Sequence, residues 1–155
     1  MSKAAAWIMK VGESFFASVS QMELVHIVNN PRYIEIPGAP DYCCNIIVWN
    51  DNILPVIDFS CLINSTTNST TCDVAAVIIY RDSNNEIQYG GINLANSPEL
   101  EYVDNSQSCE FPAHTKALQT ISLSCFKSKS GYEVPILDMN KIFTGISTEF
   151  FSMQR

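Results

Sequence analysis

The sequence is poor in positive charge, and this shortage excludes a class of partners. Nine Lys and Arg residues stand against 16 Asp and Glu residues, and the formal net charge is −7. The basic residues are scattered along the chain, with none between Arg32 and Arg81. Because phosphate groups are bound by clustered cations, we expect neither nucleic acid nor an anionic membrane surface as a partner.

Long apolar runs are also lacking. The N-terminal stretch MSKAAAWIMKVGESFFASV is interrupted by Lys10 and Glu13, so its apolar runs are shorter than a signal sequence or a membrane span requires. We therefore expect a cytoplasmic protein with no direct membrane insertion.

Motifs for catalysis and for metal binding are missing from the sequence as well. The two histidines, His26 and His114, have no carboxylate or thiolate at a metal-ligand spacing, and there is no glycine-rich phosphate loop. Gly90-Gly91 lies within a strand pattern and favours a bulge or close packing. We predict no catalytic residue, no cofactor site and no metal site, and we do not expect an enzyme.

The cysteines contain no Cys-x-x-Cys motif. Free cysteine is usually a buried, small apolar residue, so we expect reduced thiols in the core, while a redox or metal role stays open as the alternative. The six residues are Cys43, Cys44, Cys61, Cys72, Cys109 and Cys125.

The pattern of short apolar runs predicts an all-β fold of small barrels with a few short helices. Apolar residues make up 46% of the 155 residues, which suits one compact domain or two small barrels that share a core. Asn50 and Asp51 tolerate the positive φ of a tight turn, so they predict a hairpin. Strands are expected at 6–11, 14–19, 32–36, 43–49, 52–58, 74–80, 86–94, 119–126 and 132–137.

Three segments interrupt this pattern. Ser20 and Glu23 have the spacing of a capping box before an apolar stretch, which predicts a short helix over 20–28. Residues 64–71 read as a polar loop, and residues 95–112 as an acidic loop.

One short sequence motif, the repeated phrase, occurs twice, as NILPVIDFS at 52–60 and as EVPILDMNKIF at 133–143. In each, a proline in a strand is followed three positions later by an aspartate, Asp58 or Asp138. An aspartate just before a helical turn accepts hydrogen bonds from the N–H groups of that turn, so we interpret both as structural caps. A catalytic carboxylate pair is the alternative.

The strands between 34 and 57 carry more apolar side chains than one buried face needs. Either these strands are simply core, or some of the side chains form an exposed patch for a protein partner. The candidates are Ile34, Ile36, Val48, Trp49 and Ile53, with Trp49 beside the turn as the expected exposed anchor.

The stretch IPGAPDYCCNIIVWNDNILPVIDF resembles the most specific pattern of the chemotaxis coupling protein family, the CheW-like domain. The segments GGINL and VPILDMNKIF are similar to later strands and the last helix of that family. The residues that fit in the first stretch are Pro37, Pro40, Ile53, Leu54, Pro55, Val56, Ile57 and Asp58. The resemblance runs from about Trp7 to Phe143, within one domain spanning 1–155 with tails at 1–5 and 146–155.

This resemblance implies two intertwined five-stranded SH3-like β-barrels that share a core. It also implies a non-catalytic adaptor that joins the cytoplasmic tip of a chemoreceptor to the regulatory domain of a sensor histidine kinase. The alternative is a β-barrel binding module in a signalling complex outside chemotaxis, with a homodimer as one form.

The sequence departs from the family pattern at three positions, His26, Asn50 and Asp51. Family members usually have glutamate, arginine and glycine there, so two opposite charges are lost together. These departures suggest a divergent member, of the type found in the chemosensory system of type IV pili. The expected partner-binding residues are Ile34, Ile36, Val48, Trp49, Asn50, Asp51 and Leu54.

Overall fold

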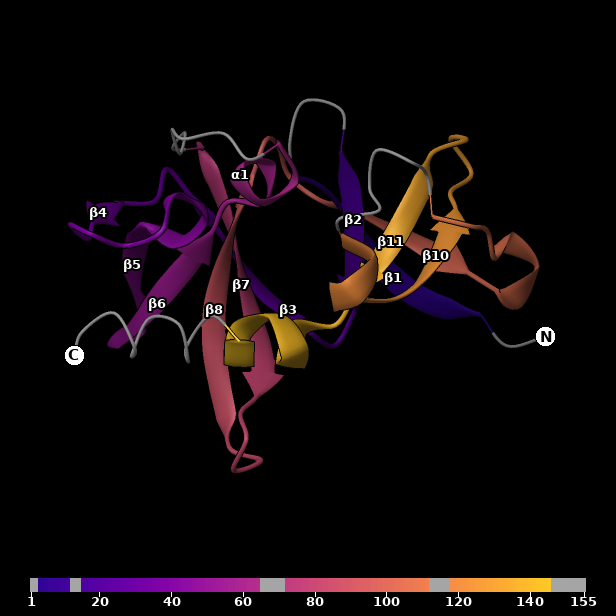
Figure 1. The fold of residues 1–155 in the computed structure, drawn as a ribbon. Coiled ribbons are helices and arrows are strands. Elements are labelled where there is room, and N and C mark those ends of the chain that lie inside the picture. The colour runs from indigo at the N-terminus through magenta and orange to yellow at the C-terminus, as the bar shows by residue number, and fades with distance from the viewer. Residues whose placement is uncertain (1–2, 12–14, 65–71, 112–117, 146–155) are drawn as a thin grey trace.

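The protein is built mainly of β-strands (Figure 1). The computed structural model describes residues 3–11, 15–64, 72–111 and 118–145. The strands are β1 Ala4–Lys10, β2 Phe16–Ser20, β3 Leu24–Asn29, β4 Ile34–Glu35, β5 Asn45–Trp49, β6 Asn52–Ile57, β7 Val74–Arg81, β8 Ile87–Leu94, β9 Glu99–Val103, β10 Ser122–Lys127 and β11 Glu133–Leu137. The helical elements in the described residues are α1 Phe59–Asn64, the 3-10 turns η1 Asp41–Cys43 and η2 Asn105–Gln107, a 3-10 segment over 118–121, and a helix over 139–145.

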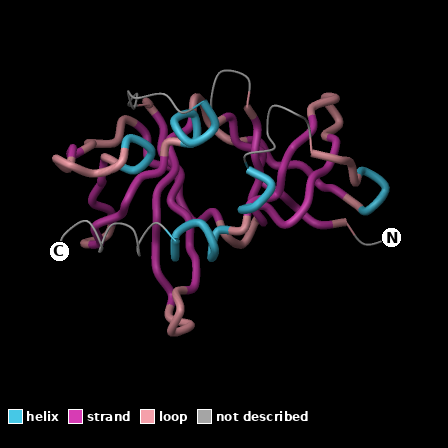
Figure 2. The backbone as a smooth tube through the Cα atoms, in the orientation of Figure 1, coloured by secondary structure: helices cyan, strands magenta, loops and turns pink. Residues whose placement is uncertain are grey.

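The strands form two sheets that lie on opposite sides of the molecule (Figures 1 and 2). The first sheet has the order β10-β11-β2-β1-β9, and the second has the order β3-β7-β8-β6-β5-β4. The chain begins in the first sheet, builds all of the second, and then returns to the first. The two halves are therefore interleaved in sequence, as the predicted intertwined barrels require.

Each sheet curls around a small apolar interior of its own. In the second sheet Ile47, Leu54 and Val77 are fully buried, with Val28, Tyr33, Trp49 and Tyr89 packed at the margin. In the first sheet the interior is formed by Ala6, Val103, Phe126 and Val134. These clusters are small, so neither barrel encloses much apolar surface by itself.

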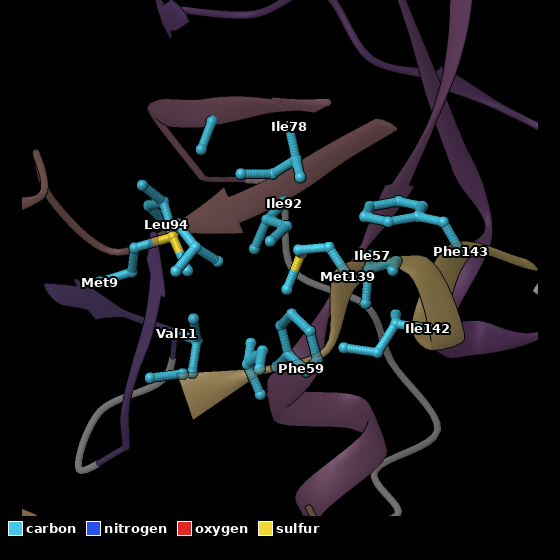
Figure 3. Close-up of a cluster of buried hydrophobic side chains, with 14 of the residues drawn as sticks. Met9, Val11, Ile57, Phe59, Ile78, Ile92, Leu94, Met139, Ile142 and Phe143 are labelled. Atoms are coloured by element: carbon cyan, nitrogen blue, oxygen red, sulfur yellow. The ribbon is translucent and has the colours of Figure 1, made fainter. Parts of the chain in front are cut away.

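A larger apolar cluster lies between the two barrels, and Figure 3 shows part of it. Met9 comes from the first sheet, Ile78 and Ile92 come from the second, and Phe143 comes from the helix that follows β11. All four side chains are completely buried. Burial of apolar surface is the main stabilising term in folding, so this shared core joins the barrels into one body.

Strand β7 takes part in two cores at once. Ala75 and Val77 face the interior of the second barrel, whereas Ala76 and Ile78 face the shared core. Side chains of a strand alternate between its two faces, so a strand that is apolar at every position can be buried on both. The run VAAVIIY satisfies this requirement.

The expected helix over 20–28 is wrong, because residues 24–29 form strand β3. One of the two capping-box hydrogen bonds forms, from the N–H of Ser20 to Glu23 Oε1 at 3.1 Å. Ser20 Oγ accepts from the N–H of Met22 at 3.3 Å, and the N–H of Glu23 donates to the backbone oxygen of Ser20 instead. They hold a turn after β2. Pairing of Ile27 with Ala76 along β7 then outweighs the local helix signal.

Two other expectations need correction. Residues 95–112 contain a strand, β9, and a 3-10 turn, η2, rather than only a loop. The expected strand over 32–36 is shorter, Ile34–Glu35. With this strand at its edge the second sheet has six strands, whereas the first sheet has the expected five. Residues 65–71 of the predicted polar loop lie outside the described residues.

Close packing around β8 explains the glycine pair at positions 90 and 91. A Cβ atom at Gly90 would overlap the ring of Phe143, and one at Gly91 would lie 3.1 Å from Cγ2 of Val56. The pairing of β8 with β7 continues through both positions without a register shift. Of the two predicted reasons for these glycines, close packing is the one that the structure supports.

Replacing Gly90 by alanine is expected to destabilise the protein by about 1–3 kcal/mol, because the ring of Phe143 must move within a filled core. The measurement is the free energy of unfolding from urea denaturation. Gly145→Ala is the control, since a Cβ there meets nothing within 4 Å. Equal stability of the two variants would contradict the packing described for Phe143.

Candidate functional site

The hairpin of β5 and β6 forms as the sequence predicts. Its turn residues Asn50 and Asp51 have φ values of 48° and 62°, the left-handed conformation that a two-residue hairpin needs. The side-chain amide of Asn52 donates to the backbone oxygen of Asn50 at 3.0 Å. This turn fixes the register, with Val48 opposite Ile53.

The register places a row of apolar side chains on the outer face of the second sheet. Val48 is 60% exposed and its partner Ile53 is 69% exposed, while Ile34 on the neighbouring β4 is 46% exposed. Ile46 lies between Ile34 and Pro55 in the pairing of the three strands, and both Ile46 and Pro55 are half-buried. We call this surface the outer patch: Ile34, Ile46, Val48, Ile53 and Pro55.

Leu54 is not part of this surface, although the sequence suggested it as a partner-binding residue. Its side chain is 1% exposed and lies in the interior of the second barrel with Ile47. Because neighbouring residues of a strand face opposite sides, exposure of Ile53 and burial of Leu54 follow from one register. Pro55 and Ile46 were missed, and the alternation counted from the turn could have found them.

Trp49 is also less exposed than an anchor would be, because its indole is half-buried at the margin of the barrel interior. It stacks on His26 of β3, with ring centroids 5.8 Å apart and planes at 29°. Its edge contacts Tyr89 of β8, with centroids 5.3 Å apart. Strands β3 and β5 are not neighbours in the sheet, so the stack of His26 on Trp49 closes the barrel between them.

The hairpin lies on the side of the second barrel that faces away from β1, β2, β10 and β11 (Figure 1). Val48 belongs to this hairpin and is 60% exposed. Ile36 is half-buried, and its N–H donates to the backbone oxygen of Cys44 at 2.8 Å. Exposed acidic residues near the patch are Glu35 on β4 and Asp51 in the turn, and Arg32, two positions before Ile34, is an exposed basic residue.

The aspartates of the repeated phrase each hold the start of a helix. Asp58 Oδ1 accepts hydrogen bonds from the N–H groups of Ser60 at 3.0 Å and Cys61 at 3.4 Å. Asp138 Oδ1 accepts one from the N–H of Lys141 at 3.2 Å. These contacts match the capping role that the sequence suggests for Asp58 and Asp138.

The buried thiols and a tyrosine favour their uncharged forms. Burial raises the pKa of Cys43 to about 12, and burial together with nearby acidic groups raises the pKa of Cys72. Burial is also the main cause that raises the pKa of Tyr33 to about 12. A protonated thiol is a poor nucleophile, so Cys43 and Cys72 are not activated for covalent catalysis.

Within the described part of the chain, no group of three or more His, Cys, Asp and Glu side chains is placed to hold a metal ion. His114 lies outside the described residues. None of the helices in the described ranges has the length and apolar character needed to cross a membrane.

Comparison with known proteins gives one family and one fold. The model of the CheW-like domain matches residues 6–147. The crystal structure of the scaffolding protein TtCheW from Thermoanaerobacter tengcongensis superposes with a TM-score of 0.70 at 15% identity, over 92% of this chain and 89% of that one. No curated protein matches the sequence. The fold of two SH3-like barrels that the resemblance implied is thereby confirmed.

Removing the Asp58 cap is expected to destabilise the protein. Asp58→Ala should lower the free energy of unfolding by about 1–2 kcal/mol, because two N–H groups of α1 lose their acceptor. Asp58→Asn keeps an acceptor oxygen and should lose less. Thermal and urea unfolding measure both, and an Asp58→Ala variant as stable as the parent would contradict the capping role.

Proposed function

Because the chain belongs to the CheW-like domain family, we propose that it is a non-catalytic adaptor that couples a chemoreceptor to a sensor histidine kinase. The proposed partners are the cytoplasmic tip of the receptor and the regulatory domain of the kinase. The outer patch is the observation that supports this proposal, since it offers Val48 and Ile53 to a partner from a rigid hairpin.

The outer patch has the properties of a protein-binding surface. Contiguous exposed apolar side chains on a well-packed scaffold are typical of protein interfaces. The inner face of the same strands is fixed by Ile47 and Leu54 in the barrel interior. Binding to Val48 and Ile53 therefore requires little ordering of the backbone, which favours affinity.

Charge around the outer patch indicates what the partner should present. Glu35 and Asp51 are exposed near it, and the exposed Arg32 is the single basic residue of the sequence from 32 to 80. We infer that the partner carries an apolar surface with basic residues at its rim. Such charge complementarity sets specificity and association rate more than total affinity.

The departures from the family pattern support a divergent member. Where the family pattern has two opposite charges, this chain has His26 and Asn50, and His26 packs on Trp49 instead. We propose that this member serves a chemosensory system of the type IV pilus kind. Normal co-sedimentation with ordinary receptor and kinase arrays would contradict that assignment.

The test is a pull-down with the receptor tip and the kinase regulatory domain as separate baits. Ile53→Asp should weaken binding to at least one bait by tenfold or more, because burying an isoleucine contributes about 1.5–3 kcal/mol and the new carboxylate opposes burial. Leu123→Asp is the matched control: Leu123 is 68% exposed, against 69% for Ile53, and lies on β10 of the other barrel.

Retained binding in Leu123→Asp with loss in Ile53→Asp would support coupling through the outer patch. Equal effects of the two substitutions would contradict the outer patch as the binding surface. Binding of the unaltered chain to neither bait would contradict the coupling role and favour the alternative, a binding module or homodimer outside chemotaxis.

A further inference from the structure

Two thiols that the adaptor role does not use lie in contact in the first barrel. The Cys109 thiol donates a hydrogen bond to Cys125 Sγ, and the two sulfur atoms are 3.4 Å apart. The N–H of Cys109 also donates to the backbone oxygen of Cys125 at 3.0 Å. Ser108 and Phe126 form an antiparallel bridge, which places Cys109 and Cys125 directly opposite each other one position further.

This contact lies where the first barrel closes. Strands β9 and β10 are the two edges of the five-stranded sheet. After β9 the chain turns through η2, and Ser108 then pairs with Phe126 of β10. The segment at Ser108 and Cys109 thus joins one edge of the sheet to the other, with the two thiols at the junction.

The geometry of the pair suits a disulfide. Residues directly opposite in antiparallel strands have Cα atoms about 4.5–5.5 Å apart, within the range that a disulfide spans. The sulfur atoms need only a small movement to bond, because they already touch. Formation of the bond therefore requires no change in strand pairing.

We propose that Cys109 and Cys125 form an oxidisable dithiol site that hydroperoxides convert to a disulfide. This proposal is independent of the adaptor role and of the outer patch, since the two cysteines belong to the first barrel and the outer patch to the second.

The reaction proceeds in two steps that balance. The Cys109 sulfur attacks one oxygen of the hydroperoxide, the O–O bond breaks, and Cys109 becomes a sulfenic acid while the other oxygen leaves as an alcohol or as water. The Cys125 sulfur then attacks the Cys109 sulfur, the S–O bond breaks, and the thiol proton leaves with the hydroxide as water. The two thiols lose two electrons, and the hydroperoxide gains them.

The environments of the two sulfurs assign the order of these steps. Cys109 is half-buried, whereas Cys125 is 2% exposed, so an oxidant reaches Cys109 first. Burial is the main cause that raises the pKa of Cys125 to about 12, and the contact with Cys109 adds to it. Cys125 is therefore not the first of the two to react with the oxidant. Its contact with the Cys109 sulfur at 3.4 Å, rather than an activated thiolate, places it to resolve the sulfenic acid.

The test treats the full chain with hydrogen peroxide and then with dithiothreitol. We expect loss of two of the six titratable thiols and loss of two hydrogens from the intact mass, both reversed by dithiothreitol. Lys116 and Lys127 are cleavage sites for trypsin, so non-reducing digestion should yield peptides 82–116 and 117–127 joined by a disulfide.

The closed loop should also stabilise the fold. The cysteines are 16 positions apart, and closing a loop of that length should raise the melting temperature by about 5–10 °C. Reduction should return it to the original value. An oxidised form that has the crosslink but a lower melting temperature would show that the disulfide disturbs the strand pairing, contrary to the proposal.

Cys109→Ser and Cys72→Ser form the matched pair of variants, because both positions are half-buried. Cys72→Ser should still lose two thiols on oxidation, whereas Cys109→Ser should form no joined peptide. Melting curves of the reduced variants are the check that both fold. A joined peptide that involves other cysteines, or Cys109 oxidised beyond the sulfenic acid with no crosslink, would overturn the proposal.

Discussion

Burial of one strand on both faces is the constraint on which the architecture depends. Strand β7 gives Val77 to the second barrel and Ile78 to the shared core, and β8 beside it gives Ile92 to that core. The barrel interiors are too small to hold separate domains, so the larger cluster between them must form for either barrel to be stable. The glycine at position 90 is part of this requirement, because only a residue without a side chain leaves room for Phe143.

This arrangement positions the outer patch. Strand β6 pairs with β8 through Val56 and Gly91, so the hairpin of β5 and β6 is attached to the buried strand pair β7 and β8. Inner side chains of the hairpin fill the barrel, and by strict alternation the outer ones face solvent. The outer patch is thus exposed because β5 and β6 are apolar on both faces while only their inner face is buried in the barrel.

Much of this could be predicted from the sequence, because the relevant signals are local and chemically specific. The positive φ of Asn50 and Asp51, and the hydrogen bonds that Asp58 accepts, depend on a few adjacent residues. Strand β3 could not be predicted in this way. Ser20 and Glu23 make one of the hydrogen bonds of a helix start, yet the next residues pair with β7, which lies about fifty positions away.

The sequence could not predict which side chains are exposed where exposure depends on the register of strand pairing. Ile53 and Leu54 are adjacent apolar residues, and composition cannot separate the exposed one from the buried one. Strand β9 was hidden because Glu99 and Glu101 interrupt it and only Val103 of its five residues is buried, so the segment lacks an apolar run. In both cases the missing information is the identity of the partner strand.

The contact of His26 with Trp49 joins β3 and β5 of the second barrel through side chains alone. The barrel needs a contact between β3 and β5, which do not pair through their backbones. An aromatic stack supplies it through dispersion and ring electrostatics. The stack also draws the Trp49 side chain to the barrel margin. In the proposed adaptor role, partner recognition is therefore assigned to the aliphatic residues of the outer patch.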